Sequence, residues 1–242
     1  MKKQVVIFII CLFTFKHSMF AQDRLTDSSF FTNAFSTVRS QYMKNIGAGS
    51  YLYNGVAFEK YWNRVVGHPF FMSEFQQGSL YYDGALYEDV PLIYDISRDQ
   101  LVSKNFSKNN DVILLSEKLR SFTLGSSKFV KIDTDSSNTS IEGGFYESLY
   151  QGSYTVLSKH KKVILHTMKG DENITRFKQY DYYYVEKDGK YQSIDGEGDL
   201  LSLLKDQRAE MRKFLNRKEI NFKKDPAGTI VQAIQYYEKL KR

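Results

Sequence analysis

Alternating apolar and polar positions through the middle of the chain predict a series of short antiparallel strands. Val90, Leu92 and Tyr94 recur at every second residue, which is the period of a β-strand. Similar runs predict further strands at 80–82, 112–115, 122–124, 129–132, 154–157, 163–165 and 182–185. Turn signals such as Asp83-Gly84 separate many of them at spacings of roughly 8–12 residues. We therefore expect an antiparallel β meander that forms a sandwich or a half-closed barrel.

Proline at position 91 interrupts this alternation and has no amide to donate, so its strand should be an edge strand or a bulged one.

Helical periodicity replaces the alternation at both ends of the meander. A stripe with spacings of four, three and four residues predicts an N-terminal helix over 29–46, and apolar residues between 200 and 215 predict one or two helices. Asp225 followed by Pro226 is typical of a helix start, and the last helix should bury Ile230, Ile234 and Tyr237. The predicted class is mainly β, of the α+β type, with helical ends.

The first 21 residues have the three parts of an export signal. Lys2 and Lys3 form a basic start, residues 5–13 are apolar, and Ala21 precedes Gln22. The apolar run is shorter than the roughly 20 residues that span a bilayer, so we expect no transmembrane anchor after cleavage. We predict a signal peptide over 1–21 and a single β-rich domain over 22–242 that is periplasmic or secreted.

Removal of the signal changes the charge and the available chemistry. The net charge of +6 falls to about +3 without Lys2, Lys3 and Lys16, a balance that gives little reason to expect a nucleic-acid partner. The single cysteine, Cys11, lies inside the signal, so the mature chain has no thiol for a disulfide, a metal or a nucleophile.

Metal ligands are poorly represented in what remains. His68, His160 and His166 stay in the mature chain, but lysines flank His160 and oppose a bound cation. The acidic positions Asp195, Glu197 and Asp199 fit either a weak calcium contact or a turn that leads into a helix cap. We expect no metal and no cofactor.

No catalytic constellation stands out, and the sequence favours a protein that is not an enzyme. Ser50 and Ser153 each follow a glycine but lack the second glycine of a nucleophile elbow. Glycoside hydrolysis needs only two facing carboxylates, and a pair such as Glu59 and Glu147 would be an arbitrary choice.

Tyrosines give the best candidate for a binding surface. In a strand, Tyr182 and Tyr184 point to one side and Tyr183 to the other, so Tyr182 and Tyr184 are the predicted ligand-binding residues. The alternative is that tyrosine simply suits a half-buried strand. The basic stretch 159–162 would suit an acidic partner, but a solvated face explains it better.

Several motifs resemble those of uncharacterised exported proteins of the Bacteroidota. They are Leu52-Tyr53-Asn54-Gly55, Gly67-His68-Pro69-Phe70-Phe71, Tyr82-Asp83-Gly84, Val90-Pro91-Leu92-Ile93-Tyr94-Asp95 and the segment 221–237. The resemblance implies export and supplies no catalytic residues.

We expect the aromatic residues after His68 to be core.

Three hypotheses of function follow. The leading one is a non-enzymatic envelope protein that binds an unknown partner protein or ligand through an aromatic sheet face. The alternatives are a carrier of lipid or another apolar ligand, and a hydrolase that acts on envelope polymers.

Overall fold

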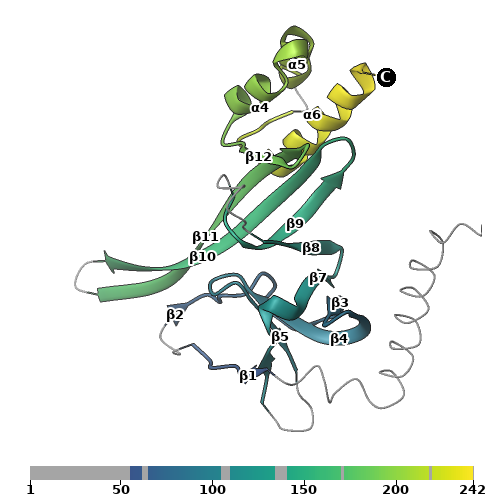
Figure 1. The fold of residues 1–242 in the computed structure, drawn as a ribbon. Coiled ribbons are helices and arrows are strands. Elements are labelled where there is room, and N and C mark those ends of the chain that lie inside the picture. Colours follow the sequence, from purple (N-terminus) through teal and green to yellow (C-terminus); the bar gives the residue numbers. More distant parts are fainter. Residues whose placement is uncertain are drawn as a thin grey trace, which may run out of the picture. The chain divides into compact units, whose positions relative to one another are not determined.

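Antiparallel strands, joined edge to edge in one large sheet, make up about half of the computed structural model (Figure 1). The structure describes residues 55–61, 65–104, 110–133, 141–169, 172–217 and 220–241. The chain divides into two compact units, Met1–Val38 and Arg39–Arg242, and every described residue lies in the second. The predicted signal peptide and the predicted helix over 29–46 lie outside the described residues.

The elements follow in the order of the chain. The strands are β1 (Val56–Ala57), β2 (Val65–Val66), β3 (Gln76–Tyr82), β4 (Ala85–Asp95), β5 (Gln100–Ser103), β6 (Val112–Ile113), β7 (Leu119–Leu124), β8 (Ser127–Ile132), β9 (Gly144–Gln151), β10 (Thr155–Lys169), β11 (Glu172–Lys187) and β12 (Lys190–Ser193). The helices are α4 (Glu197–Leu203), α5 (Arg208–Leu215) and α6 (Pro226–Leu240), with short 3₁₀ turns at Ser116–Lys118 and Lys205–Gln207.

The sheet confirms the expected class. Strands account for 49% of the structure and helices for 22%, and the C-terminal helices are present. The strand order is β1-β6-β5-β4-β3-β7-β8-β9-β10-β11-β12, with antiparallel neighbours throughout, and β2 adds to β11 in parallel. Among the described strands the sheet stays open, with β1 and β12 at the two ends of the strand order.

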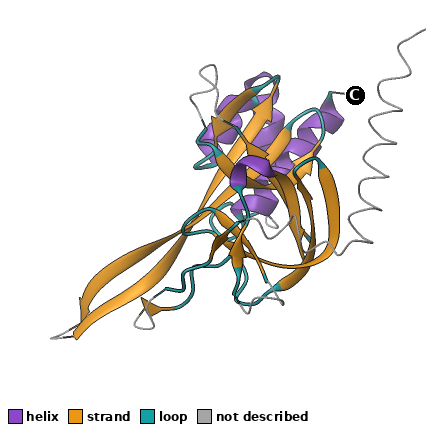
Figure 2. Cartoon of the chain, turned by 60° about the horizontal axis from the view of Figure 1, so that its bottom comes forward, coloured by secondary structure: helices purple, strands orange, loops and turns teal. Residues whose placement is uncertain are grey.

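The buried residues form two large clusters. The first lies among β3, β4, β7, β8 and β9, where the rings of Tyr94, Phe122, Phe129 and Phe145 have centroids 4.8 to 6.1 Å apart. The second lies between α4–α6 and one face of β9–β12, which Figure 2 shows as the helices gathered at one end of the long strands. Each cluster thus supports a different part of the sheet.

The last helix forms as the sequence predicts. The Asp225 carboxylate accepts the amide of Gly228 at 2.9 Å, and Pro226 occupies the first turn. Ile230, Ile234 and Tyr237 are buried, which confirms the predicted stripe.

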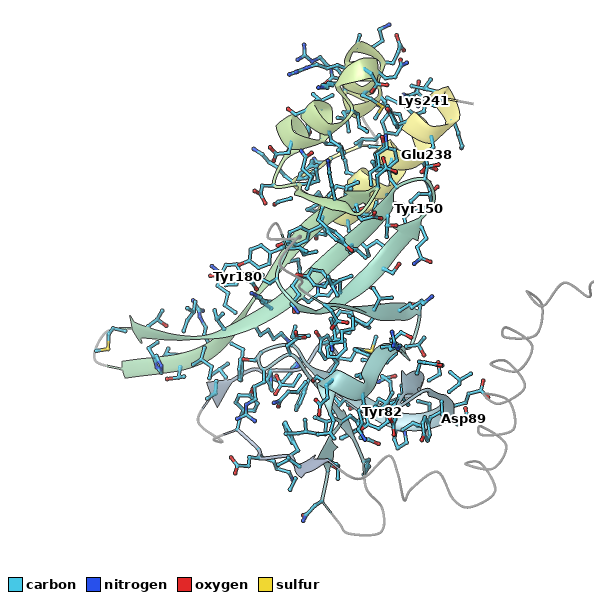
Figure 3. All side chains as sticks on the ribbon, in the orientation of Figure 1. Tyr82, Asp89, Tyr150, Tyr180, Glu238 and Lys241 are labelled. Carbon is cyan, nitrogen blue, oxygen red and sulfur yellow. The ribbon has the colours of Figure 1, made fainter. Side chains whose placement is uncertain are left out.

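Glu238 then ties α6 to the sheet. Its carboxylate accepts the Tyr150 hydroxyl at 2.7 Å and the Tyr154 amide at 3.0 Å, and Figure 3 shows Tyr150 and Glu238 close together at this end.

One prediction about strands needs correction. The candidates at 154–157 and 163–165 are parts of one strand of 15 residues, β10, because the polar stretch between them continues the extended backbone. Pro91 lies in β4 between β3 and β5, so its strand is not an edge. The pairing with β3 shifts nearby, between Gly78 and Leu80, so the strand is bulged, which confirms the second of the two forms expected for it.

The Asp95–Asp99 turn between β4 and β5 brings distant parts of the chain together. Asp95 is fully buried, and its carboxylate accepts the Tyr61 hydroxyl at 2.8 Å and the Ser97 and Arg98 amides at 2.9 and 3.1 Å. At the middle of the turn, the Ile96 carbonyl accepts the Lys162 amide at 3.2 Å. The turn therefore curls the β4 side of the sheet back onto β10.

Asp99 makes the second set of contacts of this turn. Its carboxylate accepts the Tyr94 hydroxyl at 2.5 Å and the Lys159 ammonium at 2.7 Å. Lys159 is buried and also donates to the Phe145 carbonyl at 3.1 Å. Gly144 has a φ of +130°, and a methyl group there would overlap the Asp99 carboxylate, so this close approach requires glycine.

Lys159→Met should destabilise the fold, because Asp99 then loses its cation in a largely buried site. We expect the free energy of unfolding to fall by about 2–4 kcal/mol, near the lower end for buried pairs because the Asp99 side chain keeps 32% exposure. Urea denaturation at pH 7 measures this change.

Lys161→Met is the matched control for this substitution. Lys161 pairs with Glu142, whose side chain is 71% exposed, so we expect a change within about 0.5 kcal/mol. Adding Asp99→Asn to Lys159→Met should restore part of the loss, whereas strictly additive losses would contradict the pairing.

Candidate ligand-binding cleft

A cleft of about 550 Å³ lies beside the Asp95–Asp99 turn and the middle of β11. Aromatic and other apolar side chains dominate its lining, with a few polar groups among them. The lining residues are Phe58, Lys60, Tyr61, Val65, Gly67, His68, Pro69, Phe70, Ser73, Phe75, Ile93, Asp111 and Phe177. Both the size and this mixture are typical of small-molecule sites.

Tyr61 forms one wall and is held on three sides. Its hydroxyl donates to Asp95, the Arg98 guanidinium lies 4.0 Å from the ring centroid, and the edge of the ring meets Phe177 at 5.3 Å. Burial and the hydrogen bond to Asp95 raise the pKa of Tyr61 well above its ordinary value. Arg98 also donates to the Glu59 carbonyl at 3.0 Å, which fixes the segment that carries Phe58 and Lys60.

The segment Gly67 to Phe70 forms another part of the lining. Gly67 has a φ of +88°, a conformation that glycine adopts without strain. The Pro69 carbonyl then accepts the Ile96 amide at 3.1 Å, and the Phe71 amide donates to the Tyr94 carbonyl at 2.8 Å. This docking against the end of β4 presents His68 to the cleft. The sequence predicted that Phe70 and Phe71 are core: Phe71 does pack against the first buried cluster, whereas Phe70 is a half-buried ring that lines the cleft.

A positive charge, that of Lys162, lies beside the imidazole of His68. Lys162 lies 3.4 Å from its Nδ1 and donates to the Phe70 carbonyl at 2.6 Å. Burial and then the charge of Lys162 lower the pKa of His68, which favours the neutral imidazole. The cleft therefore offers a neutral ring with hydrogen-bonding nitrogens beside an apolar surface.

One carboxylate, Asp111, is among the lining residues of the cleft. Hydrolysis of a glycosidic bond by the usual routes needs two carboxylates across the bond. Glu147, the acid named above as half of an arbitrary pair, binds His160 and is not a lining residue. The lining residues of this cleft therefore do not include such a pair.

The predicted tyrosines occupy the other face of β11. Phe177 and Tyr182 are five residues apart in a strand whose register with β10 is continuous, so their side chains point to opposite faces. Tyr182 is 41% exposed, whereas Tyr184 packs edge-on against Tyr146 with centroids 5.7 Å apart. Tyr183 packs with the helices. The prediction that Tyr182 and Tyr184 bind a ligand stays a prediction.

The basic stretch 159–162 is not the solvated face that the sequence suggested, because each member has a partner. Lys159 binds Asp99, Lys161 binds Glu142, and Lys162 binds the Phe70 carbonyl. His160 lies between two carboxylates, with Nδ1 2.6 Å from Asp181 and Nε2 2.8 Å from Glu147. These pairs hold β10 between its neighbours.

The His160 network is a structural element of the sheet. Burial alone would lower the pKa of His160, but Asp181 and Glu147 outweigh it and raise the pKa to about 9. The imidazolium in turn lowers the pKa of Asp181. Phe71 covers the ring with centroids 5.0 Å apart, so substrate has little access to it.

The remaining sequence candidates take structural positions. The Asp199 carboxylate accepts the Asp195 and Gly196 amides at 3.0 and 3.1 Å, so it serves the start of α4. Ser153 lies exposed in a turn, and Ser50 lies outside the described residues. Within the described ranges, no group of three or more histidine, cysteine or acidic side chains is placed to hold a metal ion. No helix in the same ranges combines the length and apolar character needed to cross a bilayer.

His160→Gln should give a loss of stability that depends on pH. The pKa of about 9 lies above the unfolded value of 6.5, so the stabilisation is complete below pH 6.5 and is lost as pH rises through about 9. We expect a loss of roughly 3 kcal/mol at pH 6 that shrinks towards pH 10. Urea denaturation at pH 6, 8 and 10 measures it.

His166→Gln provides the control, because His166 is an exposed histidine on the same strand. Its stability should follow that of the wild type at every pH. A loss for His160→Gln that stays constant from pH 6 to pH 10 would contradict the charged network.

Comparison of the chain with protein-family models, with curated proteins and with solved structures found no match in any of the three.

Proposed function

We propose that this protein is a non-enzymatic, exported envelope protein that binds a small, largely apolar ligand in the cleft beside the Asp95–Asp99 turn. The observation that carries the proposal is the aromatic lining of a cleft of about 550 Å³. Its walls are held by hydrogen bonds and ring contacts, so the site needs little rearrangement to accept a ligand.

The lining indicates the class of ligand. Phe58, Phe70, Phe75 and Phe177 supply ring faces for an aromatic or aliphatic body. Lys60 and the neutral His68 supply hydrogen bonds to acceptor atoms at one end of that body. A compact amphipathic molecule with a carbonyl or carboxylate group fits this arrangement better than a fully apolar chain.

The proposed location rests on the N-terminal sequence. The basic start, the apolar run and Ala21 before Gln22 support export, after which the mature chain works in the periplasm or outside the cell. The absence of cysteine beyond Cys11 agrees with a domain held by its two apolar clusters.

A second binding surface is favoured by the exposure of Tyr182. This ring is 41% exposed and lies on the face of β11 away from the cleft, where Lys178 approaches the Tyr180 ring at 4.8 Å. Such a face suits stacking of a sugar or a partner side chain. It is the weaker candidate, because Tyr184 beside it is already packed against Tyr146.

Val65→Trp should fill the cleft and abolish binding. The indole occupies space now open beside Phe177, so we expect affinity for anilinonaphthalene sulfonate, an aromatic anion used as a probe, to fall at least about tenfold. Fluorescence titration measures it. Val66→Trp is the control, because the Val66 side chain is 62% exposed and does not line the cleft. Equal affinities for the two variants would count against the cleft.

Native mass spectrometry of the protein from its own host tests for the natural ligand. We expect a bound small molecule in the wild type and in Tyr182→Ala, and none in Val65→Trp. If Val65→Trp keeps the bound molecule and Tyr182→Ala loses it, the binding site lies on the tyrosine face and not in the cleft. An unliganded mass in every sample, together with no probe binding, would reject both surfaces.

A further inference from the structure

The β10–β11 ribbon, residues 162–168 of β10 and 174–180 of β11, extends beyond the strands that flank its base (Figures 1 and 2). β9 pairs with β10 only between Thr155 and Ser158. On the other side, β2 covers β11 at Thr175 and Arg176. Beyond Lys162, the outer edge of β10 has no strand partner within the described part of the chain.

Main-chain groups at this edge are available for pairing. The Lys162 amide points away from β11, because it donates to the Ile96 carbonyl. In an antiparallel strand every second residue has this orientation, so Ile164, His166 and Met168 also direct their amides and carbonyls outward. The residues between them, such as Leu165, bond to β11.

Apolar side chains accompany the open edge. Val163 is 40% exposed, Ile164 39% and Met168 70%. A long strand edge with β-branched residues is a template for another strand, and an isolated two-stranded ribbon gains stability from a third. The ribbon therefore has both the hydrogen-bonding edge and the apolar surface that strand addition uses.

The charges of the ribbon define the kind of partner. Lys162, Arg176 and Lys178 are basic, and neither 162–168 nor 174–180 contains a carboxylate. A second copy of the chain would bring the same cations to the edge, and like charges oppose cross-strand pairing. A lipid surface offers no row of amides and carbonyls. An extended acidic polypeptide can hydrogen-bond to the open strand edge and also has the charge opposite to that of the ribbon.

We propose that the outer edge of β10 at Ile164–Met168 receives an extended acidic segment of a partner protein, which adds to the sheet as a further strand. Main-chain hydrogen bonds to Ile164, His166 and Met168 hold the segment. Arg176 and Lys178, on the neighbouring strand, attract its carboxylates.

His166→Pro tests the role of the edge. It removes one outward amide and leaves the bonds between β10 and β11 in place, because those bonds come from the neighbouring residues. His166→Ala is the matched control, since it also loses the contact of His166 Nδ1 with Thr175 Oγ1 but keeps the amide. The probe is a synthetic eight-residue peptide that alternates glutamate with valine, and its binding is followed by NMR.

The peptide should slow hydrogen exchange of the Ile164, His166 and Met168 amides in the wild type. We expect His166→Pro to weaken binding at least about tenfold and His166→Ala to change it less than about threefold. Arg176→Glu with Lys178→Glu keeps every amide and should also weaken binding, more at low salt than at high salt. This second variant keeps the test valid if proline perturbs the ribbon.

Three results would overturn the proposal. One is that the wild type and all variants bind the peptide equally well, or that none of them binds it. Another is a dimer in sedimentation experiments that His166→Pro dissociates, which would make a second copy the occupant. The last is binding to phosphatidylglycerol vesicles in the absence of peptide binding, which would make the ribbon a membrane contact.

Discussion

The carboxylates at the two ends of the Asp95–Asp99 turn hold together parts of the chain that are far apart in the sequence. Asp95 binds Tyr61 and the backbone of its own turn, while Asp99 binds Tyr94 and Lys159. A carboxylate removed from water is costly unless hydrogen bonds and cations satisfy it. Asp95 is fully buried and Asp99 partly buried, so each fixes its partners in place. The curvature of the sheet depends on these bonds, because they bring the end of β4 against β10.

The cleft is a direct result of this arrangement. Tyr61 forms a wall because Asp95 holds its hydroxyl, and the segment around His68 docks against the backbone on either side of Asp95. Phe177 completes the site from β11, whose position is set by pairing with β10. The binding site therefore belongs to the junction of three segments, and no single element contains it.

Local patterns in the sequence predicted much of the architecture, but not the site. The alternation around Val90 to Tyr94 and the Asp225-Pro226 start of α6 are short-range signals, and the structure follows them. The length of β10 could not be predicted because Lys159 and His160 look like surface residues. Their partners lie in the Asp95–Asp99 turn and on β9 and β11, far away in the sequence. The cleft could not be predicted for the same reason, because Tyr61, His68 and Phe177 form no recognisable motif in the sequence. Gly67 and Pro69 beside His68 were a local sign of a special backbone at the cleft.

The long pairing of β10 with β11 also limits how the gene for this protein can change in length. One extra residue in either strand, placed between the Ile164–Phe177 pair and the His160–Asp181 pair, would turn the side chains on one side of the insertion to the opposite face of the sheet. The partners of His160 and the cleft wall at Phe177 would then no longer lie in their present register. Equal insertions in both strands beyond Phe177 would leave that register intact. Related chains should therefore keep the base of the ribbon constant and vary its reach in matched steps.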